Sequence, residues 1–237
     1  ADLADLADLD APPGSVVLEG PSWSPPEYGP LDTATIHDGF DVDAVHGTEG
    51  IHNLEAVADG IRWRAKGQPA HVRESRAQAW LPIPEVDTVV ETFDFRFDSP
   101  FDFGEQAKFG YGLMGYHSGL RFPGGGYCHE PDWLIRPMWH AYGNQPLRFA
   151  VYIYSTGEDT ARLPGQSWQT ACVGGGHRRL VRLGDRPPAS GVDHVWRLAI
   201  DRNPVTGWAD ISVEISDPHG VLVDWDATVK LNSPANR

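Results

Sequence analysis

The stretch that decides the fold is Arg148–Tyr154, which reads RFAVYIY. Arg148, Ala150, Tyr152 and Tyr154 alternate with apolar residues, so the two sets lie on opposite sides of an extended chain. A two-residue period of this kind predicts a β-strand with one apolar face against a core and one more polar face turned outward.

The neighbouring sequence continues the same pattern. Leu134–Tyr142 places Arg136, His140 and Tyr142 on one side, and Thr88–Phe97 places mostly apolar side chains on one side. Further strands are expected at 61–65, 77–81, 107–117, 178–183, 194–200, 208–215 and 222–225, and no amphipathic helix of useful length is found. Many alternating strands without helices predict an all-β fold, an antiparallel two-sheet β-sandwich of the jelly-roll, concanavalin-like type.

The chain is expected to form one domain. Residues 1–14, which read ADLADLADLDAPPG, are expected to be a flexible tail because the repeat is too short and acidic for a stable helix. Residues 15–237 are expected to form the sandwich, with 15–60 supplying edge strands and loops. A length of 237 residues suits a single β-sandwich domain.

Charge and hydropathy exclude some functions. The net charge of −14 argues against a nucleic-acid partner, since binding phosphates needs a basic surface. A polyanionic ligand would need a local basic region to overcome this mean charge. The sequence has no run of about 18 apolar residues, so no membrane partner is expected.

The two cysteines, Cys128 and Cys172, allow two interpretations. They can form one disulfide in a secreted protein, or remain as buried free thiols. The histidines are scattered and no CxxC pair occurs, so neither a metal site nor a cofactor is expected. A structural calcium ion is left open, because Asp224 and Asp226 alone do not argue for one.

Three motifs in order resemble a known family. Residues 107–119 read AKFGYGLMGYHSG, and 134–155 read LIRPMWHAYGNQPLRFAVYIYS. They resemble the alginate and glucuronan lyases of polysaccharide lyase families 14 and 20, in which a GGKLPGL strand precedes an RxMWR strand and a YxY strand. Arg136 and Trp139 match the second motif, and Tyr152 and Tyr154 match the third. The resemblance implies a jelly roll that cleaves a uronic-acid polysaccharide by β-elimination.

One position departs from the family pattern. The family's catalytic lysine falls on Gly112, and His140 stands where the second motif has its last arginine. Lys108 has the parity of Gly112, but four residues of a regular strand would separate them by about 13 Å. Lys108 is therefore not expected to replace the missing amine unless a register shift or bulge intervenes.

The chemistry of elimination assigns roles to the remaining groups. Arg136 is expected to neutralise the substrate carboxylate, because a guanidinium is a fixed planar donor. Tyr152 or Tyr154 is expected to act as acid or base, and His140 or His117 to act as a base or second neutralising group. The rival interpretation is that the tyrosines and Arg136 are ordinary residues of a sheet surface.

Substrate contacts beyond the reacting centre are expected from an aromatic and several basic groups: Lys108, Tyr116, Arg148, His177 and Arg178. The last two follow a glycine run, 174–176, which is expected to be a flexible loop. The expected partner is an anionic polysaccharide or oligosaccharide, and the protein is expected to be a secreted monomer.

Two other functions stay open. A jelly roll that has lost the family lysine can be a noncatalytic carbohydrate-binding module. A glycoside hydrolase needs two carboxylates roughly 5–9.5 Å apart. Glu91, Asp94, Glu105 and Glu214 are available for such a pair, but no pairing among them stands out.

Overall fold

The computed structural model describes residues 82–119, 127–141, 145–156, 161–162, 167–173 and 176–236, together with short strands at 29–30, 44–46, 54–57, 60–63 and 78–80. All regular structure in these residues is β-strand. None of it is a helix that could cross a membrane.

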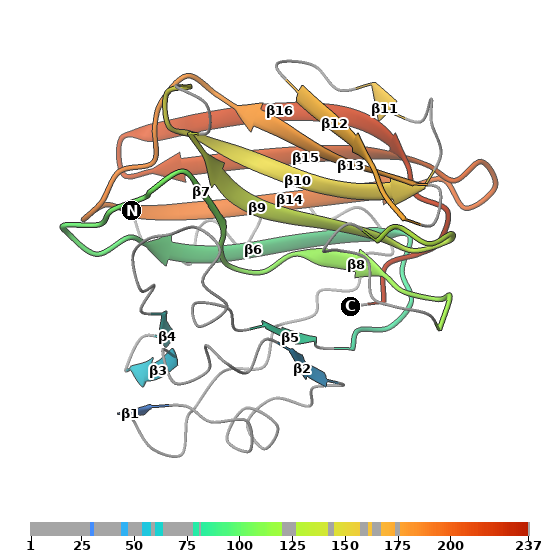
Figure 1. Cartoon of the computed structure of the whole chain (residues 1–237), viewed down its shortest axis with the longest axis horizontal. Coiled ribbons are helices and arrows are strands. Elements are labelled where there is room, and N and C mark those ends of the chain that lie inside the picture. The colour runs from blue at the N-terminus through green and yellow to red at the C-terminus, as the bar shows by residue number, and fades with distance from the viewer. Residues whose placement is uncertain are drawn as a thin grey trace.

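Two antiparallel sheets are stacked face to face (Figure 1). The first sheet has the order β12-β13-β10-β9-β7, with β8 also paired to β9. Its strands are β7 (Gln106–Lys108), β8 (Leu113–Gly115), β9 (Trp133–His140), β10 (Arg148–Thr156), β12 (Ser167–Ala171) and β13 (Gly176–Leu183). The second sheet has the order β11-β16-β15-β14-β6. Its strands are β6 (Thr88–Arg96), β11 (Ala161–Arg162), β14 (Asp193–Arg202), β15 (Trp208–Asp217) and β16 (Gly220–Lys230). The predicted β-sandwich is confirmed.

The core lies between the sheets and follows the alternation of each strand. Phe149, Val151 and Ile153 of β10 are fully buried, and they belong to one cluster with the inward residues of β14, β15 and β16. At one end this cluster becomes aromatic, with Phe95, Phe97, Phe101, Phe103, Phe109 and Trp139 in ring contact. The inward face of each strand is therefore fixed by core packing, and its other face must point to the outside.

The early strands do not extend either large sheet. β1 (Gly29–Pro30), β3 (Leu54–Val57) and β4 (Gly60–Trp63) form one small sheet, and β2 (Ala44–His46) pairs with β5 (Gln78–Trp80). The expectation that 15–60 adds edge strands to the sandwich is therefore wrong for these strands, which pair among themselves. Residues 1–14 lie outside the described residues. The flexible tail at 1–14 and the single domain at 15–237 therefore stay predictions.

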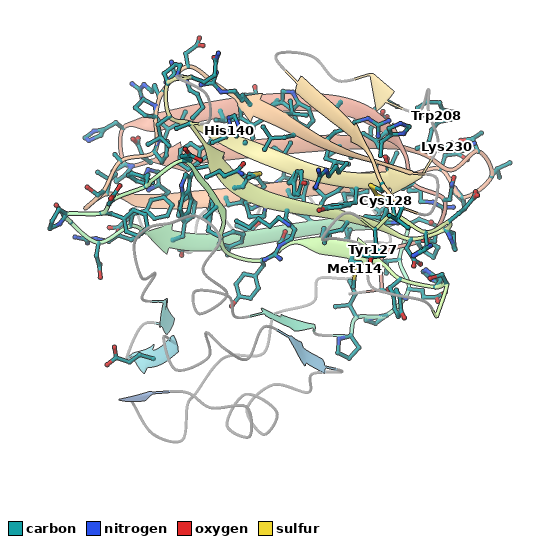
Figure 2. The ribbon with its side chains drawn as sticks, in the orientation of Figure 1. Met114, Tyr127, Cys128, His140, Trp208 and Lys230 are labelled. Atoms are coloured by element: carbon teal, nitrogen blue, oxygen red, sulfur yellow. A yellow bond between two sulfur atoms is a disulfide. The ribbon has the colours of Figure 1, made fainter. Side chains whose placement is uncertain are left out.

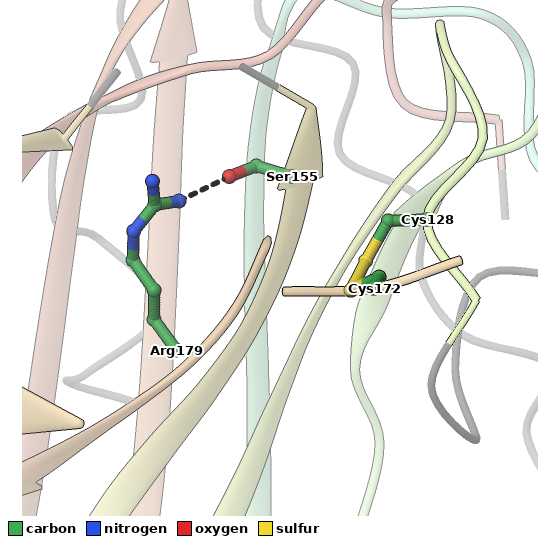
Figure 3. Close-up of a disulfide and its surroundings, with 4 residues drawn as sticks. All are labelled: Cys128, Ser155, Cys172 and Arg179. Atoms are coloured by element: carbon green, nitrogen blue, oxygen red, sulfur yellow. Dashed lines mark hydrogen bonds between the residues drawn. A yellow bond between two sulfur atoms is a disulfide. The ribbon is translucent and has the colours of Figure 1, made fainter. Parts of the chain in front are cut away.

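Cys128 and Cys172 form a disulfide (Figure 3). This finding selects the disulfide over the free thiols. It ties the segment before β9 to the end of β12, beside the place where β10 and β13 pair. In the same view the guanidinium of Arg179 donates a hydrogen bond of 2.5 Å to Ser155 Oγ, and both residues are buried.

Candidate functional site

The outward face of the first sheet brings Arg136 and the two tyrosines together. Tyr152 of β10 lies directly opposite Arg136 of β9, and Tyr154 lies opposite Leu134. The rings of Tyr152 and Tyr154 meet edge to face, with centroids 4.8 Å apart. Tyr152 is half-buried, whereas Tyr154 is only 1% exposed and packs with Met114, Cys128 and Leu134. Tyr152 is therefore the tyrosine that an incoming ligand can touch.

Lys108 completes this group from the edge of the sheet. Its Nζ lies 4.6 Å from the centroid of the Tyr152 ring and 5.5 Å from that of Tyr154. An ammonium over a tyrosine face is a cation–π contact. The lysine, the two tyrosines and Arg136 thus form one cluster, which we call the Lys–Tyr–Arg cluster.

The exception allowed for Lys108 applies here, because a bulge interrupts the predicted strand at 107–117. Lys108 pairs with Met138 and Leu113 pairs with Ile135, so residues 109–112 lie opposite only Arg136 and Pro137. This bulge brings Lys108 to a position two β9 residues from Arg136, about 7 Å along the strand. Gly110 makes the turn with a φ of +58°, and a Cβ there would lie 2.3 Å from the Phe93 ring.

Gly112 lies beside Arg136, and its lack of a side chain makes room for the arginine. A Cβ at Gly112 would lie 2.7 Å from Arg136 Cγ and 2.5 Å from the carbonyl oxygen of Ile135. The stem of Arg136 thus occupies space that a side chain at 112 would need. Gly112, where the resemblance expected a lysine, thus contributes no side chain, and the amine beside the tyrosines is that of Lys108.

Arg136 is held without a close partner. No hydrogen bond or ion pair ties its guanidinium to any residue within the described part of the chain. Burial lowers the pKa of Arg136, while the nearby Glu91 and Tyr154 raise it. A guanidinium stays protonated in proteins. Its charge therefore lies beside Tyr152, which is its partner across the strand pair.

The charges on the two outer faces have opposite signs. On the first sheet, every charged side chain at the outward positions of the described β7, β8, β9, β10 and β13 is basic: Lys108, Arg136, Arg148, Arg178 and Arg182. We call this surface the cationic face. On the second sheet, the carboxylates of Asp94, Asp193, Asp201, Asp210, Glu214, Asp224 and Asp226 outnumber the cations of Arg96, Arg197 and Lys230. A protein of net charge −14 thus carries a local basic surface.

His140 shares the cationic face but not the Lys–Tyr–Arg cluster. It lies opposite Arg148, four residues along β9 from Arg136, which is about 13 Å. Figure 2 shows it at one end of the sheet, away from Met114 and Cys128 at the other. Burial, and then the charge of Arg182, lower the pKa of His140. The structure does not bring this histidine to the tyrosines.

The other predicted residues divide between the two sides of the sheet. Tyr116 packs against the Met114 and Tyr154 cluster, so it borders the site. Arg178 lies opposite Tyr154 on the cationic face. His177 alternates to the other side of β13, and the predicted loop is strand from Gly176 onward. The ring of His117 is bound by Glu85, with Nε2 and Oε1 3.1 Å apart, outside the cluster. Tyr142 lies outside the described residues.

Reasoning from sequence missed Arg182, and it named Glu91 only as one carboxylate of a possible hydrolase pair. Arg182 has the same parity as Arg178, and a strand assigned from 178 onward was enough to place both on one face. Glu91 interrupts the apolar positions Val89, Phe93 and Phe95 of β6. A carboxyl group at a core-facing position is a signal in itself, because a buried charge is costly.

No family model and no curated protein matches the sequence. Two solved structures are similar. One is alginate lyase Aly36B, a mutant with a lysine and a tyrosine each replaced by alanine, in complex with alginate tetrasaccharide: TM-score 0.56, 14% identity, 91% of this chain and 84% of that one. The other is the marine PL-14 alginate lyase from Aplysia kurodai: TM-score 0.57, 14% identity, 86% of this chain and 90% of that one. The chain therefore has the β-sandwich fold of these alginate lyases.

Proposed function

We propose that this protein is a polysaccharide lyase that cleaves a uronic-acid polysaccharide by β-elimination. One observation carries the proposal: the Lys108 ammonium lies over Tyr152, which faces Arg136 across the strand pair. The cluster holds an amine, a phenol and a guanidinium, the groups that this reaction needs. It lies on a face whose charged residues in the described strands are all basic.

Arg136 has the role of neutralising the substrate carboxylate. Elimination needs negative charge to develop on the uronate carboxylate as the proton on C5 is removed. A fixed guanidinium at that point stabilises the charge more in the transition state than in the ground state. No described residue is hydrogen-bonded or ion-paired to the guanidinium, and this supports its binding of a substrate carboxylate.

Lys108 and Tyr152 have the role of moving protons. The base takes the C5 proton, the C5–H electron pair forms the C4–C5 double bond, and the C4–O bond breaks. The departing oxygen keeps the electron pair of the broken C4–O bond and takes a proton. The half-buried Tyr152 serves as the proton carrier that contacts substrate, and the ammonium of Lys108 beside its ring supplies a second exchangeable proton. Tyr154, being buried, positions Tyr152 through the ring contact.

The cationic face extends the site beyond the reacting centre. Arg178 lies toward one end of the face, and Arg148 and Arg182 toward the other. This arrangement supports binding of a chain that carries a carboxylate on successive sugars. The disulfide supports action outside the cell, where such bonds persist.

The test is ultraviolet absorbance during incubation with a panel of alginates and glucuronans. Elimination yields a conjugated unsaturated uronate that absorbs, while hydrolysis and binding yield none. We expect activity on at least one polymer and a loss of roughly 10²- to 10⁴-fold in Tyr152→Phe. Tyr127→Phe, a tyrosine outside the cluster, serves as the matched control and should keep its activity.

A flat trace with every polymer, together with measurable binding of one of them, would contradict the lyase proposal. The binding module would then be the better interpretation, and it has one structural argument. The stem of Arg136 takes the space beside Gly112, so no lysine can be accommodated at the family position. New reducing ends without the absorbing product would indicate hydrolysis instead.

A further inference from the structure

Glu91 is an ionisable residue at a core-facing position that the proposed reaction does not use. It lies on β6 between Val89 and Phe93, whose side chains pack against the core, and opposite Leu198 of β14, which is fully buried. Its Oε2 is buried and has no hydrogen-bond partner among the described residues. An unpaired buried carboxyl group costs stability, so its presence calls for a reason.

The bulge between β7 and β8 opens the edge of the first sheet above Glu91. Phe93, two residues along β6, lies directly under Gly110, and its ring also contacts Tyr111 at 5.3 Å between centroids. Arg136 lies over Gly112 on the same edge. The charge of Glu91 acts on both Tyr111 and Arg136. The carboxyl group of Glu91 on the second sheet and the guanidinium of Arg136 on the first thus lie around the same bulge and interact electrostatically.

We propose that Glu91 is a proton-linked counter-ion of Arg136, which leaves the guanidinium charge to a substrate carboxylate when neutral and competes with that carboxylate when ionised. The substrate half of this inference rests on the proposed function. The pairing of Glu91 with Arg136 does not, and can be measured without any substrate.

The pKa of Glu91 lies close to neutral pH, so its charge changes within the pH range of a binding assay. Burial raises the pKa of Glu91 from 4.5 to about 8, and the Arg136 charge opposes that rise. The groups that act on it are Arg136 on β9 and Tyr111 in the bulge; its β14 neighbour Leu198 is apolar. Below about pH 8 the carboxyl group is neutral and Arg136 keeps its full charge. Above that pH, the ionised group cancels part of the charge.

The first measurement is a carbon NMR titration of protein labelled in its glutamate carboxyl groups. The Glu91 signal is identified as the one lost in Glu91→Gln. We expect it to titrate far above the ordinary glutamate range, and to titrate higher still in Arg136→Gln, where the favourable cation is gone. An unchanged Glu91 titration in Arg136→Gln would overturn the pairing.

The second measurement is the Kd of a uronate tetrasaccharide between pH 6 and 9.5, made by calorimetry in the slow Tyr152→Phe background. Affinity should fall on the alkaline side by at most about tenfold per pH unit, the limit for one linked proton. Adding Glu91→Gln should remove this fall. Adding Asp94→Asn, which removes a charge from the exposed side of the same strand, should keep it.

The two measurements test separate parts of the inference. An alkaline fall that is the same with and without Glu91→Gln would overturn the competition, whatever the NMR result. If no oligouronate binds at any pH, the proposed function and the substrate half of the inference fail together. The NMR titration still decides whether Glu91 and Arg136 are coupled.

Discussion

Lys108 lies 4.6 Å from the Tyr152 ring although the strands that carry them are not neighbours. β9 separates β7 from β10, so the lysine reaches across Met138 to the tyrosine. The contact depends on the bulge at 109–112, which sets Lys108 close to Arg136 along the edge. The amine of the cluster thus comes from Lys108, and not from position 112 on the same edge of the sheet.

The first prediction separates the charge of Lys108 from its proton. Lys108→Met should lower kcat by roughly 10²-fold or more, because both the charge and an exchangeable proton are lost. Lys108→Arg keeps the charge but does not give up a proton, so it should restore substrate affinity without restoring kcat. Steady-state kinetics on the preferred polymer measure both. Lys230→Met, on the other sheet, is the control, and equal losses in the two methionine variants would contradict the role of Lys108.

The second prediction concerns Gly112. Gly112→Ala should cost about 1–3 kcal/mol of unfolding free energy and weaken substrate binding, since its Cβ displaces Arg136. Gly112→Lys should lower the unfolding free energy and the substrate affinity further. The double variant Gly112→Lys/Lys108→Met should stay inactive, although it places a lysine where the sequence resemblance expected one. Denaturant unfolding and the absorbance assay test both points. An active double variant would show that the Arg136 side chain can move to make room for a lysine at position 112.

The third prediction is a pH dependence of stability. The folded-state pKa of Glu91, about 8, lies above its unfolded value of 4.5, so the folded protein holds a proton that the unfolded chain releases. Stability from this group is complete below pH 4.5 and is lost as the pH rises through 8. Glu91→Gln should escape this loss, by an amount on the order of 5 kcal/mol at pH 9, since the pKa shift spans about 3.5 units and each unit is worth about 1.4 kcal/mol.

Unfolding by urea at pH 5, 7 and 9 measures this difference. The gap between Glu91→Gln and the wild type should widen with pH, whereas Asp94→Asn should give a constant offset. A gap that does not change with pH would mean that Glu91 ionises as an exposed glutamate does.

The fourth prediction concerns the disulfide. Cys128 and Cys172 are 44 residues apart in sequence, and closing a loop of that size stabilises a protein by about 4 kcal/mol in the chain-entropy model. Cys128→Ser/Cys172→Ser should lose about that amount. Cys128 also packs with Leu134 and Tyr154, so kcat should fall as well. Calorimetric unfolding and kinetics at a temperature well below the new Tm separate the two effects.

The fifth prediction concerns His140. Since burial and Arg182 lower its pKa, His140 should be neutral throughout the pH range in which Glu91 titrates. His140→Gln should leave kcat within a few-fold and raise KM for long chains more than for short ones. A kcat loss as large as that of Tyr152→Phe would restore His140 to the reacting centre.

The long alternating strands were predictable because their pattern and their packing agree. Arg148–Tyr154 fixed both faces of β10, and the same parity placed Arg136 beside Tyr152. The interruption at 109–112 was not predictable from alternation, since parity is the same with and without two extra residues. Only pairing with β9 distinguishes them, and pairing is a property of the partner strand. The glycines at 110, 112 and 115 were the local sign of it.

The coupling of Glu91 to Arg136 was missed for a different reason. A single carboxyl group in an apolar series reads as an exception to the pattern, and its partner, Arg136, comes from the other sheet. Disulfide formation likewise depended on which loops meet. Sequence therefore predicted the sheets well and the contacts between distant segments poorly.

The opposite charges of the two outer faces give the described strands of the sandwich an electric dipole along the direction in which the sheets are stacked. A polyanion at a distance meets a protein of net charge −14, and is repelled by it on average. At shorter distance, the torque on the dipole rotates the protein until Lys108 and Arg136 face the polyanion. The rate of productive encounter should then depend on ionic strength in two opposing ways, through screening of the overall repulsion and through loss of this alignment.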